Sequence, residues 1–259
     1  MIIDIHNHTL LCNHATGSIE EFTKEAIEKK IDIFGFSDHA PMKFDEKYRM
    51  SFKQMKQYEA QVLHVKEKYK TEIEILLGYE VDYIEDYMDE RVMKAKVDYL
   101  IGSVHFLNYW GFDNPEFIGE YQNHNIDKIW EDYFKAIEEM AKSNLFDIVG
   151  HIDLIKVFKY LPKKEIKFIA KNAIKAIKKS NMVVEINSAG LRKPINEIYP
   201  SSDIMELLVD FDIPITFSSD AHRIEEISYK KDEILQYAKS FGYEKCAIFR
   251  NREREMVNF

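Results

Sequence analysis

The chain has 259 residues, of which 46% are apolar and 31% charged, and its formal net charge is −9. These values are ordinary for one large globular α/β domain, and the negative charge argues against a broad surface for nucleic acid or anionic membrane, although not against an anionic substrate. No apolar run is long enough to span a bilayer, the N-terminus starts directly in strand-like sequence, and the two cysteines offer no disulfide framework, so we expect a cytoplasmic protein without a signal peptide.

Short apolar runs alternate with amphipathic helical stretches along the chain. We predict strands over residues 2–6, 32–37, 73–78, 99–104, 147–150, 183–186 and 214–217. We predict helices over residues 18–30, 52–70, 126–143, 163–179, 201–211 and 228–241, the first of them opened by a capping box at Ser18 and Glu21. The one long irregular stretch, residues 106–125, is expected to be a loop of the kind that forms lids or binding sites.

The repeated strand–helix order predicts a parallel sheet. The predicted strands are nearly all apolar, as expected when helices cover both faces of a sheet. Seven such units favour an α/β fold of the TIM-like barrel type, a closed or nearly closed (β/α)7 barrel, with a doubly wound open sheet as the alternative. We expect residues 1–259 to form a single domain.

Most of the predicted strands end in polar side chains that can bind a metal ion. Barrels of this kind build their active sites at the C-terminal ends of the strands. The residues at or beyond these ends include His6, His8, His14, Asp38, His39, Glu80, His105, His151, Arg192, Asp220 and His222. Seven of the nine histidines belong to this set, whereas His64 and His124 are explained more simply as surface residues. Histidines with unrelated structural roles would not be sorted in this way, so the pattern predicts a metal site.

Nine side chains are candidate metal ligands: His6, His8, His14, His39, Glu80, His105, His151, Asp220 and His222. Residues two apart in a strand point to the same side, so His6 and His8 are expected to project together. A catalytic zinc ion keeps about three protein ligands and an open position, so nine ligands suggest two or three ions. Imidazole and carboxylate ligands suit zinc, iron or manganese, and the sequence does not discriminate among these. Asp38 is expected to orient the ring of its neighbour His39.

Seven short motifs contain or accompany these candidate ligands, all of which except His14 lie in them. They are His6-Asn-His8, Ser37-Asp-His39, Gly78-Tyr-Glu80, Gly102-Ser-Val-His105-Phe, Gly150-His151, Glu185-Ile-Asn-Ser-Ala-Gly-Leu-Arg-Lys193 and Ser219-Asp-Ala-His222. With these motifs, essentially the whole chain resembles the polymerase and histidinol phosphatase (PHP) superfamily. The Gly-Leu-Arg-Lys segment after the sixth predicted strand makes it similar in particular to the stand-alone histidinol-phosphatase branch.

The resemblance implies a distorted seven-stranded barrel with a trinuclear metal site. By this resemblance, one ion is held by His6, His8, Glu80 and Asp220, a second by Glu80 with His105 and His151, and the third by His14, His39 and His222. It also implies an enzyme of histidine biosynthesis that hydrolyses L-histidinol phosphate, a small phosphate monoester.

Hydrolysis of a phosphate monoester needs accelerations that approach about 10²¹-fold, far beyond what acid–base groups supply. We therefore expect a metal-bridging hydroxide near Glu80 to attack phosphorus, with Glu80, Asp220 and His39 as the catalytic residues.

Three further residues are candidates for binding the substrate. Arg192 is a candidate phosphate clamp because its planar fork matches phosphate geometry. Lys156, five residues after His151, is a second candidate, with a structural role as the equal alternative. Asp113, in the segment 106–125, is a candidate contact for the ammonium or imidazole of histidinol.

Other functions stay open at this point. A PHP phosphoesterase that acts on nucleotides or another small phosphomonoester would use the same ligands, although the negative charge disfavours DNA. A non-catalytic metal-binding scaffold is a further alternative, disfavoured because all nine ligand positions are filled. Homo-oligomerisation is not readable from the sequence.

Overall fold

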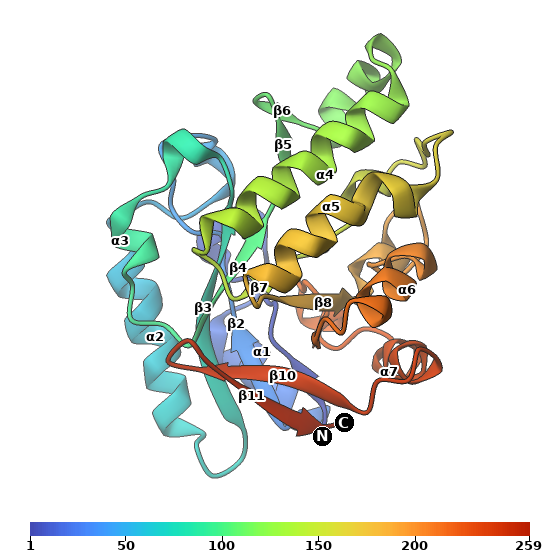
Figure 1. The fold of residues 1–259 in the computed structure, drawn as a ribbon. Coiled ribbons are helices and arrows are strands. Elements are labelled where there is room, and N and C mark those ends of the chain that lie inside the picture. Colours follow the sequence, from blue (N-terminus) through green and yellow to red (C-terminus); the bar gives the residue numbers. More distant parts are fainter.

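A parallel sheet of seven strands lies at the centre of the computed structural model, which describes residues 1–259 (Figure 1). In spatial order the strands are β1 (Ile3–Asp4), β2 (Ile33–Phe36), β3 (Glu74–Asp82), β4 (Tyr99–Ser103), β7 (Ile148–Val149), β8 (Val183–Asn187) and β9 (Ile215–Ser218). The first and last strands meet, because the Ile5 amide donates to the Phe217 carbonyl at 3.2 Å and the His8 amide donates to the Ala221 carbonyl at 2.9 Å. The predicted seven-stranded barrel is confirmed, and all seven predicted strands form.

Helices connect the strands and cover the outside of the barrel. They are α1 (Ile19–Glu28), α2 (Met55–Lys68), α3 (Glu90–Met93), α4 (Ile126–Ser143), α5 (Ile166–Lys179), α6 (Ser202–Asp210) and α7 (Lys231–Ser240). All six predicted helices form, and the predicted capping box is present, since Ser18 Oγ accepts from the Glu21 amide at 3.2 Å and Glu21 Oε2 accepts from the Ser18 amide at 2.7 Å. Helices α4 and α5 pack side by side (Figure 1). None of the helices combines the length and the apolar character that crossing a bilayer requires.

Shorter elements fill the connections. Four strands form two hairpins: β5 (Phe106–Leu107) with β6 (Trp110–Gly111), and β10 (Lys245–Arg250) with β11 (Glu253–Asn258). Turns of 3₁₀ helix cover Leu10–Cys12, Glu46–Tyr48, Glu85–Tyr87, Pro115–Asn123, Leu154–Lys156, Ser188–Arg192 and Ile224–Glu226.

Residues 106–125 are not the irregular loop that the sequence predicts. Hairpin β5–β6 turns at Asn108 and Tyr109, which have φ of 48° and 68°, the left-handed geometry of tight hairpin turns. The following 3₁₀ helix begins at Pro115 and is capped by Asn114, whose side chain accepts the Glu116 amide at 2.9 Å. Hydrophobic periodicity does not reveal these elements, because each strand is only two residues long and the helix is a 3₁₀ helix rather than an α-helix.

Hairpin β10–β11 is also absent from the predicted elements. Its first strand buries the apolar run 246–249, which is the signal that identifies it. The turn residue Arg252 donates its amide to the Asp98 carbonyl at 2.8 Å and its guanidinium to the Leu145 carbonyl at 2.7 Å. Asp98 and Leu145 precede strands β4 and β7, so the hairpin lies at the N-terminal ends of these strands, opposite to the predicted ligands.

A tyrosine occupies the interior of the barrel near its first strand. The fully buried Tyr99 of β4 donates its hydroxyl to the Ile5 carbonyl at 2.6 Å. A Cβ on Gly35 would overlap the Tyr99 hydroxyl and stand 2.9 Å from the Cα of Ile5. Glycine at position 35 therefore makes room for this ring.

Replacing Gly35 by alanine should lower the free energy of unfolding by about 1–3 kcal/mol, because the added methyl group overpacks the barrel interior. Urea denaturation of the wild type and the variant measures this difference. Gly119→Ala is the matched control, since nothing lies within 4 Å of a Cβ built at that position. Equal stability of Gly35→Ala and Gly119→Ala would contradict the packing argument.

Candidate metal centre

The first and last strands bring two ligand segments together where they meet. Asn7 and Ala221 form a parallel β-bridge, which places the His-Asn-His segment beside Asp220 and His222. Because residues two apart in a strand share a face, His6 and His8 point to the same side of the bridge. His8 Nε2 accordingly lies 3.0 Å from Asp220 Oδ1.

Glu80 lies inside β3 rather than after the strand, and its carboxylate is at the centre of the donor set. Strand β3 is longer than predicted because it stays paired with the residues that follow β2: the Glu80 amide donates to the Ser37 carbonyl at 3.1 Å, and the Ala40 amide donates to the Glu80 carbonyl at 2.8 Å. Five imidazoles approach the carboxylate, at 2.9 Å from His39 Nδ1, 3.0 Å from His151 Nε2, 3.4 Å from His6 Nε2, 3.6 Å from His8 Nε2 and 3.7 Å from His105 Nε2. This is the position that a bridging ligand needs.

The predicted ligands gather into three compact groups. These are His6, His8 and Glu80; Glu80, His105 and His151; and His14, His39 and His222, with the donor atoms of each group within 4.8 Å of one another. Asp220 adjoins the first group, since its Oδ1 lies 3.0 Å from Nε2 of His8 and 3.8 Å from Nε2 of His6. The structure thus brings all nine predicted ligands together, in the same sets that the family resemblance implies.

Several of these donor atoms are buried without a hydrogen-bond partner. They are His6 Nε2, His8 Nε2, His222 Nε2 and Glu80 Oε2. A buried polar atom without a partner costs about 1–3 kcal/mol, so several that converge on one place are explained by a cation between them. Mixed imidazole and carboxylate donors suit zinc, iron and manganese. The residues therefore fit divalent metal ions.

The pKa shifts of Glu80 and His39 agree with this chemistry. Burial disfavours ionisation of Glu80, but the rings of His39, His6 and His105 hold the pKa of its carboxyl well below the usual range. Burial lowers the pKa of His39 to about 4, against the opposing effect of Glu80. At neutral pH Glu80 is therefore a carboxylate and His39 a neutral imidazole, the forms that bind metal. Against the effect of burial, neighbouring carboxylates raise the pKa of His6 well above its usual value, that of His8 to about 9 and that of His105 to about 10, so a metal ion would have to displace a proton from each of these rings.

Two buried carboxylates contact the Nδ1 atoms of candidate imidazole ligands. The sequence analysis did not identify either of them. Glu185 Oε2 lies 2.9 Å from His6 Nδ1, and Asp82 Oδ1 lies 2.6 Å from His105 Nδ1. Contacts of this kind fix the orientation and tautomer of a ligating ring. Both residues leave a signal in the sequence: each is a charged residue inside a predicted or adjoining apolar strand, and Asp82 stands two positions after Glu80 on the same face.

The Asp38 carboxylate faces a different histidine from the one expected. Its Oδ1 lies 3.5 Å from Nδ1 of His8, whereas it accepts only the backbone amide of His39, at 2.8 Å. The prediction that Asp38 orients the His39 ring is therefore wrong, because the side chain turns back toward strand β1. Cys12, which the sequence did not suggest, lies within 4.8 Å of donor atoms of His8 and His222.

Arg192 reaches the loop that carries Asp220. It ends the 3₁₀ helix after β8, and its Nη2 donates to the carbonyl oxygens of Ser219 at 2.9 Å and Asp220 at 3.1 Å. Its Nε lies 3.5 Å from Glu226 Oε1. The remaining nitrogen, Nη1, is buried without a partner. One arm of the guanidinium therefore has no hydrogen-bond partner within the chain.

Lys156 is not brought to the donor set. Its buried ammonium donates to the Ile198 carbonyl at 2.8 Å and lies 3.1 Å from Asp153 Oδ2 and 3.3 Å from Glu197 Oε2. These three oxygens match its three N–H donors. The contacts favour the structural role of Lys156 over phosphate binding.

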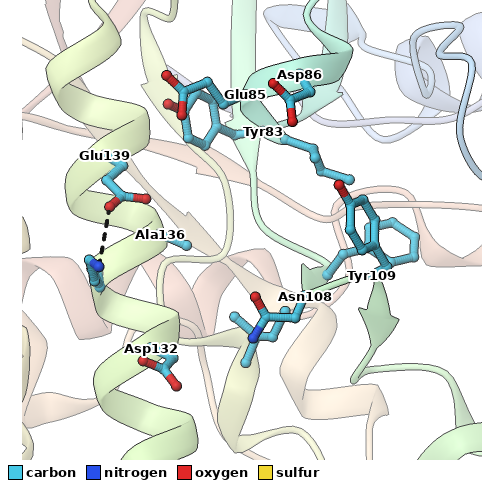
Figure 2. A pocket seen from close by; sticks show the side chains of 12 residues that line it. Tyr83, Glu85, Asp86, Asn108, Tyr109, Asp132, Ala136 and Glu139 are labelled. Atoms are coloured by element: carbon cyan, nitrogen blue, oxygen red, sulfur yellow. Dashed lines mark ion pairs between the residues drawn. The ribbon is translucent and has the colours of Figure 1, made fainter.

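Asp113 lies close enough to His105 and Lys193 for their charges to lower the pKa of its carboxyl, although burial, the larger effect, raises that pKa. Its neighbour Tyr109 instead lines a cavity of about 320 Å³ between hairpin β5–β6 and α4 (Figure 2). None of the nine candidate ligands lines that cavity. Asp113 thus lies near the candidate metal centre.

Comparison with known proteins agrees with this centre. Residues 4–189 match the family model described as PHP domain. The chain belongs to the PHP family. A curated relative, the probable histidinol-phosphatase of Deinococcus radiodurans, is 33% identical to this PHP protein over 98% of each chain. The histidinol-phosphatase of Bacillus subtilis is 27% identical over 90% of this chain and 98% of its own length.

The barrel of this PHP protein also has a solved counterpart. The histidinol phosphate phosphatase of Lactococcus lactis, whose crystal structure contains zinc, L-histidinol and phosphate, superimposes with a TM-score of 0.78. The two chains are 19% identical, and 98% of each is covered. This likeness shows that the fold is shared.

Proposed function

We propose that this PHP protein is a metal-dependent phosphatase that hydrolyses L-histidinol phosphate to L-histidinol and phosphate. The observation that carries the proposal is the convergence of buried, unpartnered imidazole and carboxylate atoms beside a guanidinium with one free arm. The names of the relatives from Deinococcus radiodurans and Bacillus subtilis support the choice of substrate.

The nine candidate ligands would hold two or three divalent ions, zinc, iron or manganese. Such ions, when bound, neutralise phosphoryl oxygens and lower the pKa of water. Arg192 would bind the phosphate through its free Nη1 and so orient the phosphorus for attack.

We assign different tasks to the two central carboxylates. Glu80 is 1% exposed and enclosed by imidazoles, so it serves to hold the ligand set together. The Asp220 side chain is 16% exposed, so its carboxylate is the more accessible of the two, and the oxygen not turned toward His8 would accept the proton of an incoming water molecule. His39, with its ring 2.9 Å from Glu80, would keep that carboxylate oriented.

The alcohol part of the substrate would lie toward Asp113. L-histidinol carries an ammonium and an imidazole, and a carboxylate beside the phosphate site is the group that distinguishes it from a neutral alcohol. We therefore propose Asp113 as a contact for the substrate.

Turnover of defined substrates tests the proposal. The protein is stripped of metal, reloaded with Mn²⁺ or Zn²⁺, and assayed for phosphate release from L-histidinol phosphate, a nucleoside monophosphate and a simple alkyl phosphate. We expect L-histidinol phosphate to have the highest kcat/KM by at least about 10-fold, the discrimination that one charged hydrogen bond supplies. The stripped protein should be inactive.

Each alternative has its own outcome in this assay. Equal and poor turnover of all three esters would contradict the substrate but leave a phosphomonoesterase. Preference for the nucleotide would favour a nucleotide phosphoesterase. Absence of both bound metal and activity after reloading would favour a scaffold. Four features remain predictions: the single domain, the cytoplasmic location, the lack of nucleic-acid partners and a homo-oligomeric state.

A further inference from the structure

Glu185 connects ligands of two different ion sites. The residue lies on β8, is fully buried, and belongs to none of the proposed ligand sets. Its Oε2 lies 2.9 Å from His6 Nδ1, and its Oε1 accepts the backbone amide of His151 at 2.6 Å. His6 belongs to the first donor group and His151 to the second, so one side chain sets the spacing between the two groups.

Each group in contact with the Glu185 carboxylate donates a hydrogen bond to it. The backbone amide of His151 donates to Oε1, and Asn187 Nδ2 donates to the same oxygen at 2.7 Å. The Asn187 amide cannot turn around, because its Oδ1 accepts the Ala189 amide at 2.8 Å. A carboxylate only accepts, so His6 must carry its proton on Nδ1. When the ring is neutral, the lone pair of His6 is then on Nε2, the atom that faces Glu80 at 3.4 Å.

The same side chain is linked to the segment that ends in Arg192. Asn187 is the residue before the 3₁₀ helix Ser188–Arg192 and caps it through the Ala189 amide. Glu185, by holding the Asn187 amide, therefore fixes the start of the turn that presents the guanidinium.

We propose that Glu185 is a positioning residue that selects the metal-binding tautomer of His6 and couples it to His151. This inference rests on the metal centre of the proposed function. It assigns a role to a residue that would contact neither an ion nor the substrate.

Glutamine at position 185 has the size of glutamate, but it cannot accept hydrogen bonds from His6 at one end and from His151 and Asn187 at the other. If its oxygen accepts from His151 and Asn187, its amide group donates to His6 Nδ1 and moves the ring proton to Nε2, which blocks metal binding. If its oxygen accepts from His6, its amide group faces two donors. Glu185→Gln should therefore bind Zn²⁺ about 10- to 100-fold more weakly, the usual cost of losing such a contact.

The test measures metal binding and the tautomer directly. Metal-free wild type and Glu185→Gln are titrated with Zn²⁺ by calorimetry, and the ¹⁵N-labelled imidazoles are observed by NMR, with the His6 signal assigned by its absence from His6→Ala. With Zn²⁺ bound, we expect His6 to be protonated at Nδ1 alone in the wild type and to lose this state in the variant. Asp98→Asn is the matched control, because Asp98 also accepts a backbone amide, that of Leu77 at 2.9 Å, but lies at the other end of the barrel.

The outcomes separate the inference from the proposed function. Wild-type Zn²⁺ affinity and an unchanged His6 tautomer in Glu185→Gln would overturn the inference alone. Equal weakening in Glu185→Gln and Asp98→Asn would also overturn it, by showing a general loss of stability. A wild-type protein that binds no Zn²⁺ would overturn the metal centre and this inference together.

Discussion

Replacing Glu80 by glutamine should reduce the kcat of phosphate release by about 10³-fold or more. The change keeps the size of the side chain but removes the one negative charge that five imidazoles approach, from 2.9 Å to 3.7 Å. Loss of a single preorganised electrostatic group in an active site commonly costs about 10²–10³-fold in kcat, and Glu80 belongs to two donor groups at once. The measurement is the initial rate on L-histidinol phosphate, with the metal content of each sample determined by elemental analysis.

Glu74→Gln is the control for this variant. Glu74 lies on the same strand at the opposite end, where it pairs with Arg250 through contacts of 2.6 Å and 2.7 Å. Its replacement removes an ion pair that is more than a third exposed and should leave kcat unchanged. A wild-type rate in Glu80→Gln would show that the centre of the donor set takes no part in catalysis.

Replacing Arg192 by alanine should lower kcat/KM about 100-fold, mainly through KM. A hydrogen bond to a charged group contributes about 1.5–3 kcal/mol, and the guanidinium would also neutralise part of the phosphate charge. Inorganic phosphate, which shares the proposed contact, should inhibit the variant with a constant raised by a similar factor. Initial rates over a range of substrate and phosphate concentrations give both quantities.

Arg192 could bind phosphate or only stabilise the Asp220 loop, since its Nη2 also donates to the Ser219 and Asp220 carbonyls. Two comparisons distinguish these roles. Arg254→Ala, which removes an exposed arginine bound to Asn181, should change neither constant. The metal content of Arg192→Ala should equal that of the wild type. A fall in metal content with an unchanged phosphate inhibition constant would identify Arg192 as a brace only.

Local sequence patterns were sufficient for the seven strands of the barrel and for six of its seven helices, all but the four-residue α3. Each strand is an apolar run of a few residues, and helices such as α4 and α5 show a clear helical period, because both faces of the sheet and one face of each helix are buried. Hairpin β5–β6 and the 3₁₀ helix after it were missed, because two-residue strands carry no period and their form depends on the backbone of Asn108 and Tyr109.

The nine candidate ligands could be found from the sequence, because parallel strands present their C-terminal residues at one end of a barrel whatever the details of packing. Their partners could not be found in this way. Glu185 and Asp82 gain their contacts from residues far away in the chain, and the sequence gives no distance between strands. Asp38 shows the same limit, since adjacency to His39 suggested one ring and the fold placed its carboxylate beside His8.

Lys156 and Arg192 show most clearly what the sequence predicts and what only the tertiary structure decides. Both are cations that follow barrel strands, and the sequence allows both to bind phosphate. Only the tertiary structure shows that Lys156 has all its donors occupied while Arg192 keeps one buried nitrogen without a partner. The sequence by itself determined the barrel and the set of candidate ligands, because periodicity and strand ends are local properties. The packing decided which atoms are free to act, because a hydrogen-bond partner is a matter of position in space.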